Sequence, residues 1–167
     1  MRRIYILSLV LIALCLIISS CAKRCRTIET YRGSMAVNML INRPWMDEFP
    51  EKPEQPFVGY IFTDEAAGIS DRADSLYKHL IEIFAFKSSA EKISFIFPHD
   101  RRKAESTYKV ERIEFKGQFN LKLTLQKDPQ MKGKTYVYFS NTNWNIKNEE
   151  TIPEEIRGFC SLIRGFK

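Results

Sequence analysis

Histidine and glycine are scarce in this chain, and neither forms the local patterns that catalytic and phosphate-binding sites need. The sequence contains two histidines, His79 and His99, and seven scattered glycines. Neither histidine has metal-ligand spacing to another histidine or cysteine, and no glycine-rich phosphate loop is present. Without a placed histidine, a Ser–His or Cys–His nucleophile pair is hard to build. We therefore expect no enzyme, no metal and no cofactor, with a pair of carboxylates meeting across loops as the catalytic alternative.

Long apolar runs are also rare, and the one present lies at the N-terminus. Arg2 and Arg3 precede a run at Ile4–Ile18 that only Tyr5 and Ser8 interrupt. At about 15 residues this run is shorter than the ~20 residues that a membrane-spanning helix needs. Its length and positive flank are typical of a secretory signal peptide.

The residues that follow this run are Ile18-Ser19-Ser20-Cys21. They resemble the lipobox of bacterial lipoproteins, in which an aliphatic residue and two small residues precede a cysteine. The resemblance implies that residues 1–20 are removed and that the thiol of Cys21 carries lipid. Ala22 is not aspartate, which by this resemblance favours the outer membrane, facing the periplasm. An uncleaved N-terminal anchor and a secreted protein cut nearby are the alternatives.

Cysteine is rare, and two of the four are assigned by this resemblance: Cys15 leaves with the signal peptide and Cys21 is lipidated. Cys25 and Cys160 remain, an even pair in an oxidising compartment. One disulfide between them is therefore a possible pairing, but the sequence alone does not establish that they are close.

The remaining chain is long enough for one domain. Residues 21–30 are interpreted as a tether and residues 31–167 as a single α+β domain. We predict a mainly antiparallel sheet of about six strands with two helices, in the order ββαββββα. The expected strands cover 35–41, 57–63, 93–97, 108–115, 119–126 and 134–140, and the expected helices cover 70–87 and the segment that starts at 151 and ends before Gly165.

Two loops are candidate partner-binding surfaces. The proline-rich loop Pro44–Pro56 carries Trp45, Met46 and Phe49, which are of the types enriched at interface cores. The loop with Arg101, Arg102 and Lys103 is the densest basic run, suited to phosphate or carboxylate groups on a partner. The alternatives are that the apolar residues cover the sheet and that the basic run is simply solvated.

These observations favour a membrane-anchored, non-enzymatic envelope lipoprotein that binds a protein partner or assembly. The alternative is a carrier of a lipid or other apolar ligand. Nucleic acid is not an expected partner, because no nucleic-acid motif appears. The two functions differ in one observable. A carrier needs an apolar cavity of ~300 Å³ or more, whereas a binding module is solid inside with an apolar patch outside.

Overall fold

The computed structural model describes residues 25–52, 55–75 and 78–163. The expected signal peptide and the expected lipidation site, Cys21, lie outside these residues. The strands are β1 (Thr27–Thr30), β2 (Arg43–Met46), β3 (Val58–Phe62), β4 (Ala67–Ser75), β5 (Lys78–Ser88), β6 (Lys92–Phe97), β7 (Arg102–Lys116), β8 (Phe119–Asp128) and β9 (Lys134–Ser140). The helices are α2 (Gly33–Leu40), the 3-10 helix η1 (Glu149–Thr151) and α3 (Glu154–Leu162).

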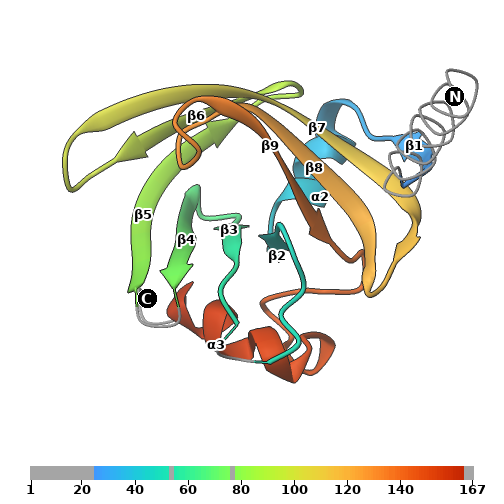
Figure 1. Ribbon diagram of the computed structural model, residues 1–167. Coiled ribbons are helices and arrows are strands. Elements are labelled where there is room, and N and C mark those ends of the chain that lie inside the picture. Colours follow the sequence, from blue (N-terminus) through green and yellow to red (C-terminus); the bar gives the residue numbers. More distant parts are fainter. Residues whose placement is uncertain (1–24, 53–54, 76–77, 164–167) are drawn as a thin grey trace, which may run out of the picture.

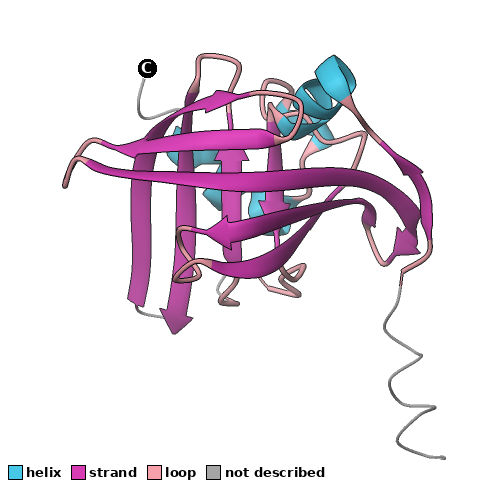
Figure 2. Ribbon diagram, turned by 90° about the horizontal axis from the view of Figure 1, so that it is seen from above, coloured by secondary structure: helices cyan, strands magenta, loops and turns pink. Residues whose placement is uncertain are grey.

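The strands form a closed antiparallel β-barrel rather than the predicted six-strand α+β sheet. The sheet runs in the order β1-β7-β6-β5-β4-β3-β2-β9-β8, and an additional β7–β8 pairing closes strands β2–β9 into an eight-stranded ring. Figure 1 shows these strands curving around a common centre, and Figure 2 shows the long strands from above. Strand β1 pairs with β7 in addition to this ring. The predicted fold class was therefore wrong.

The largest correction concerns residues 70–87, which were expected to be a helix. They belong to the β4–β5 hairpin, in which Gly68 pairs with Phe84 and Ile69 with Ile83. Phe84 and Phe86 point into the barrel and are buried, whereas Ile83 faces outward and is partly exposed. Because β5 is apolar on both faces, its apolar residues also match a helical period. Periodicity alone therefore could not decide between a strand and a helix.

The segment 35–41, expected to be a strand, is mostly the helix α2. Ala36 and Leu40, four residues apart, are its buried residues and contact the interior of the barrel. Alanine, methionine and leucine favour helix, and this preference outweighed the alternating pattern. The remaining expected elements are confirmed within a few residues as β3, β6, β8, β9 and α3. The strand expected at 108–115 is longer than predicted, because β7 already begins at Arg102.

Buried aromatic side chains occupy the interior of the barrel. Neighbouring rings contact one another across strands, with Tyr60 and Tyr138 centroids 5.2 Å apart and Phe84 and Phe95 centroids also 5.2 Å apart. Such spacing is that of directly packed rings. The interior core comprises Tyr31, Ala36, Leu40, Trp45, Val58, Tyr60, Phe62, Phe84, Phe86, Ile93, Phe95, Phe97, Tyr108, Val110, Leu121, Leu123, Leu125 and Tyr138.

A second apolar cluster lies outside the barrel, where α3 covers β3 and β4 (Figure 1). Ile61 and Ile69 contribute the outward residues of these strands, and Phe159 contributes from α3. Phe159 meets Phe57 edge to face, with ring centroids 5.1 Å apart. No helix within the described residues has the length and apolarity needed to cross a membrane.

Gly68 allows the ring of Phe84 to pack directly on strand β4. A Cβ at this position would lie 2.5 Å from the carbonyl oxygen of Ile61 and 2.5 Å from the Phe84 ring. We expect Gly68→Ala to lower the free energy of unfolding by about 1–3 kcal/mol, since overpacking displaces backbone and ring. Gly158→Ala in α3 is the matched control, because no atom lies within 4 Å of its Cβ position, and it should be neutral or stabilising by ~0.5–1 kcal/mol. Urea unfolding of both variants measures these changes in stability. Equal stabilities of the two variants would contradict the close packing of Phe84 on Gly68.

Strand β1 is attached to the barrel through Glu111 of β7. The whole strand falls within the segment 21–30 that was expected to be a tether. The buried carboxylate of Glu111 accepts a hydrogen bond from the Thr27 hydroxyl at 3.2 Å, and lies 2.7 Å from Lys109 and 2.6 Å from Lys122. Burial alone would raise the pKa of Glu111, but the hydrogen bonds and charges of the two lysines outweigh it and lower the pKa. The ionised carboxylate therefore stabilises the folded state.

The stabilisation by Glu111 should depend on pH. Because its pKa is lower in the folded state, this contribution is present above the unfolded pKa of ~4.3 and is lost as pH falls through the folded pKa. We expect the difference in unfolding free energy between the parent and Glu111→Gln to shrink steadily below about pH 4.3. Glu105→Gln, which removes an exposed pair with Lys92, is the control and should show a small difference at every pH. A pH-independent difference for Glu111→Gln would contradict this account.

The barrel is closed at one place by very little strand pairing. Strands β2 and β9 share a single residue pair, Met46 with Phe139. On one side of this pair, the Ser140 hydroxyl donates to the Pro44 carbonyl at 2.6 Å. On the other side, β2 ends and the chain continues into the β2–β3 loop. We call this junction between β2 and β9 the barrel seam.

Candidate functional site

A groove of about 1080 Å³ lies over the barrel seam. It is bounded by the start of the described chain, the β2–β3 loop, the β7–β8 hairpin and strand β9. Its lining residues are Cys25, Arg26, Asp47, Glu48, Phe49, Glu114, Phe115, Lys116, Gly117, Phe119, Thr135, Tyr136 and Val137. We call it the seam groove.

The floor of the seam groove is aromatic. Phe119 stacks on Phe139 with ring centroids 5.5 Å apart and contacts Phe49 at 6.0 Å. Lys116 places its Nζ 4.0 Å from the centre of the Phe139 ring, a cation–π arrangement. Phe115 also lines the groove and is 73% exposed, the most exposed large apolar side chain among the described residues. An aromatic side chain left in water beside an apolar floor is typical of a binding surface.

The charges around the seam groove are of both signs. Arg26 and Glu114 lie 3.7 Å apart on the side of β1 and β7. On the opposite side, the Tyr136 hydroxyl donates to Asp47 at 2.9 Å. Burial, together with the hydrogen bond to the Asp47 carboxylate, raises the pKa of Tyr136 to about 12, so this hydroxyl keeps its proton at neutral pH. The groove therefore presents no field of one sign to a ligand.

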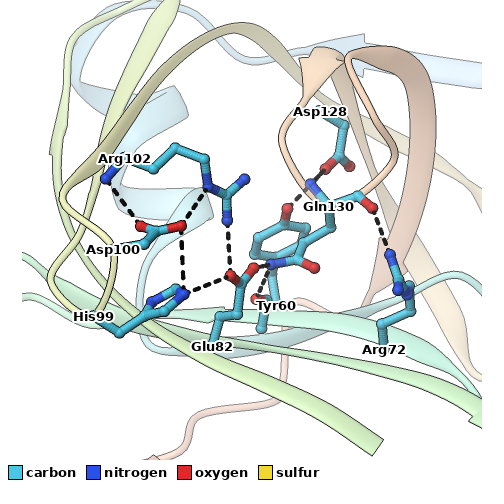
Figure 3. Close-up of polar contacts among 9 residues, drawn as sticks. Tyr60, Arg72, Glu82, His99, Asp100, Arg102, Asp128 and Gln130 are labelled. Carbon is cyan, nitrogen blue, oxygen red and sulfur yellow. Dashed lines mark hydrogen bonds and ion pairs between the residues drawn. The ribbon is translucent and has the colours of Figure 1, made fainter.

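A second polar feature lies inside the barrel, where Gln130 from the β8–β9 loop enters the end of the lumen (Figure 3). Its side-chain NH2 group donates to the Ser70 hydroxyl at 2.7 Å and to Glu82, and its backbone carbonyl oxygen accepts from Arg72 at 3.2 Å. Gln130 is 3% exposed, and Ser70 and Asp128 are fully buried. We call Ser70, Glu82, Asp128 and Gln130 the polar plug.

Asp128 is the centre of the hydrogen bonds in this polar plug. Its carboxylate accepts from the hydroxyl of Tyr60 at 2.7 Å, from that of Tyr138 at 2.6 Å and from the backbone N–H of Gln130 at 2.8 Å. Burial raises the pKa of Asp128, and these hydrogen bonds offset part of that rise. The plug joins the β8–β9 loop to the barrel wall through groups that bond to one another, which is the pattern of a structural network.

Glu82 extends this network to the surface. Arg102 donates to Glu82 at 2.7 Å and lies 3.9 Å from the centre of the Phe97 ring. His99 approaches Glu82 at 3.6 Å and Asp100 at 3.4 Å. Within the described part of the chain, no group of three or more histidine, cysteine, aspartate or glutamate residues is arranged to hold a metal ion.

The structure separates the residues expected to bind a partner. Trp45 and Met46 are fully buried, so they are not accessible to a partner in this conformation. Phe49 is partly buried and lines the seam groove. Arg101, Arg102 and Lys103 lie where β7 begins, whereas Phe115 lies near its other end. Strand geometry allows roughly 40 Å between them, so the basic run and the groove are distinct surfaces.

The two cysteines considered for a disulfide occupy different places. Cys25 lines the seam groove and is partly exposed. Cys160 is buried in α3, in the second apolar cluster outside the barrel. No disulfide joins this pair in the structure.

Comparisons of the chain with protein-family models, with curated proteins and with solved structures find no significant match.

Proposed function

We propose that the protein is a lipid-anchored, non-enzymatic module of the bacterial cell envelope that binds a protein partner in the seam groove. The observation that carries this proposal is the exposure of Phe115 in a groove that Phe49 and Phe119 also line. The Phe119 ring contacts Phe49 and stacks on Phe139, which fixes its position. Aromatic anchors in a partly enclosed groove supply much of the binding energy at protein interfaces. A β-barrel with a packed interior gives such a surface a rigid support.

The lipobox-like sequence and the position of the groove support the same proposal. Cys25, which lines the groove, follows the expected lipidated residue Cys21 by four residues. Four peptide units span at most about 14 Å. An anchored molecule would therefore hold the groove close to the membrane surface, where a membrane-bound partner has a high effective concentration. Even a modest contact area would then give useful occupancy.

Carriage of an apolar ligand is the second candidate, because a closed eight-stranded barrel is an architecture that can hold one small ligand. The packing of the interior weighs against it. Trp45, Tyr60 and Phe95 are buried in the lumen, and the ring centroids of Tyr60 and Phe95 lie 6.3 Å apart, a ring-packing distance. The polar plug occupies one end of the barrel, so a ligand would have to displace both the rings and Gln130.

The proposal is tested by site-directed photocrosslinking in the envelope. The full chain, with its signal sequence, carries a photoreactive phenylalanine analogue at position 115, and a matched chain carries it at position 96. Ile96 is also exposed and apolar but lies on strand β6, away from the groove. We expect a discrete protein adduct from position 115 and little from position 96. Equal yields, no adduct at 115, or an adduct with lipid alone would contradict a protein partner in the groove.

A further inference from the structure

We propose that the occupant of the seam groove is an extended peptide segment of the partner, which adds as a strand to the open edge of β9. This inference rests on the proposed function and names the kind of partner that the groove accepts. It is carried by the direction of backbone groups at the barrel seam.

The alternation of hydrogen bonds identifies which backbone groups face the seam. In antiparallel strands, successive residues direct their N–H and C=O groups to opposite neighbours. The Asp47 N–H donates to the Val58 carbonyl at 3.0 Å, so Asp47 faces β3 and Met46, one residue earlier, faces β9. Met46 pairs with Phe139, so Phe139 directs its backbone groups towards β2. Residues two and four positions before Phe139 point the same way, and these are Val137 and Thr135.

Nothing in the described chain pairs with those groups on Val137 and Thr135. Strand β2 ends at Met46, and the side chain of the next residue, Asp47, does not bind the backbone of Thr135 or Val137. One of its carboxylate oxygens accepts a hydrogen bond from the Val58 N–H at 2.8 Å, and the other accepts one from the Tyr136 hydroxyl. Among the described residues, hydrogen bonds outside the β8–β9 ladder involve neither Thr135 nor Val137. Two N–H donors and two C=O acceptors therefore face the groove.

These four groups match an extended peptide better than other ligands. Unpaired edge groups are a template for another strand, and residues two apart on a strand repeat every ~6.8 Å, the same repeat as the incoming backbone. Main-chain hydrogen bonds would provide affinity, and side-chain contacts would provide specificity. The added strand would place alternate side chains against Phe49, Phe115 and Phe119, which favours apolar residues at every second position.

The shape of the groove favours a single segment over a second copy of this barrel. The groove is bounded by the β2–β3 loop on one side and by the β7–β8 hairpin on the other. A flexible extended segment can enter between these walls, whereas a strand that belongs to another barrel carries its neighbours with it. The walls carry charges of both signs, three acidic residues (Asp47, Glu48 and Glu114) and two basic ones (Arg26 and Lys116), which suits a segment of low net charge.

The test begins with backbone amide exchange of the full chain in detergent, measured by nuclear magnetic resonance. In the protein alone, the amides of Thr135 and Val137 should exchange rapidly, and those of Tyr136 and Tyr138, which face β8, slowly. The probe is a capped nine-residue peptide of zero net charge, five central residues alternating valine and threonine with one lysine and one glutamate at each end. On its addition, exchange at Thr135 and Val137 should slow at least tenfold. Slow exchange at these two amides before addition would overturn the inference.

Two variants separate the backbone contribution from that of the side chain. Val137→Pro removes the N–H that faces the groove, and proline is tolerated where an edge N–H has no partner. Val137→Ala shortens the side chain but keeps the N–H. We expect Val137→Pro to bind the probe roughly three- to tenfold more weakly than Val137→Ala, the loss of about one hydrogen bond. The amide spectrum of each variant checks that the barrel is intact.

The outcomes distinguish this inference from the proposed function. Strand addition is contradicted if the probe shifts the resonances of Phe115 but does not slow amide exchange at Thr135 and Val137. It is also contradicted if the two variants bind the probe with equal affinity. Either result leaves the groove as a binding surface. The absence of probe binding at millimolar concentration also contradicts strand addition. The proposed function itself is tested separately, by comparing the crosslinked adducts from positions 115 and 96.

Discussion

Replacing Asp128 with alanine should lower the free energy of unfolding by about 2–6 kcal/mol. The variant leaves the buried hydroxyls of Tyr60 and Tyr138 without their acceptor, and each buried unsatisfied group costs ~1–3 kcal/mol. It also releases the Gln130 N–H, which holds the β8–β9 loop. Chemical unfolding monitored by tyrosine and tryptophan fluorescence measures the effect.

Tyr60→Phe and Tyr138→Phe are the matched controls, because each removes a donor and leaves the carboxylate one remaining tyrosine. Each should cost about 0.5–1.5 kcal/mol or slightly more for a charged acceptor. The cost of Asp128→Ala should fall in a background that carries both tyrosine substitutions, since no hydroxyl is then left unpaired. An unchanged cost in that background would show that the polar plug does not act through these hydrogen bonds.

Trp45→Ala should lower the free energy of unfolding by about 3–5 kcal/mol, the range for large aromatic side chains in a core. The indole is fully buried, and its N–H donates to the Leu40 carbonyl at 2.8 Å, which ties α2 to strand β2. The substitution removes both the ring packing and the partner of that carbonyl. Thermal and urea unfolding measure the change.

Phe49→Ala provides the comparison for Trp45→Ala, because Phe49 is only partly buried at the edge of the outer cluster. We expect a smaller loss of stability, about 1–2 kcal/mol, together with weaker crosslinking from position 115. A Trp45→Ala variant of unchanged stability that no longer binds its partner would assign Trp45 to the binding surface and contradict its place in the core.

Strands with one apolar face could be predicted from the sequence, and strands with a polar interior could not. In β8, Leu121, Leu123 and Leu125 alternate with polar residues and all three are buried. In β4, Ser70 points into the barrel and is buried because Gln130 bonds to it from 60 positions away along the chain. A local sequence pattern contains no information about a hydrogen-bond partner so far along the chain, so β4 was not recognised as a strand.

The closure of the barrel also depends on information that a local pattern lacks. The β4–β5 hairpin was expected to be a helix because β5 is apolar on both faces, and without that hairpin the strand count was too low to close a ring. The pairing of β2 with β9, which completes the ring, joins Met46 and Phe139, residues far apart along the chain. Sequence periodicity specifies faces of strands and not their neighbours.

Part of the candidate site was accessible from the sequence. Phe49 was expected to contribute and does line the groove, but Trp45 and Met46 were grouped with it because all three lie in or next to a proline-rich loop. Phe115 was missed, although its setting carries a signal: it is an aromatic residue between Glu114 and Lys116, two residues before Gly117 in the turn. An apolar side chain beside a polar turn has little within the chain to pack against, which makes it a candidate binding residue.

The most direct test of the account is native mass spectrometry of the mature protein extracted from membranes. The account predicts a chain that begins at Cys21, carries covalent acyl groups, and holds no further apolar ligand, because the lumen is filled by its own aromatic side chains and by the polar plug. A chain that begins at Met1 or an unmodified Cys21 would contradict the lipid anchor. An apolar molecule bound one to one, and lost on collisional activation, would contradict the filled barrel and establish a carrier instead.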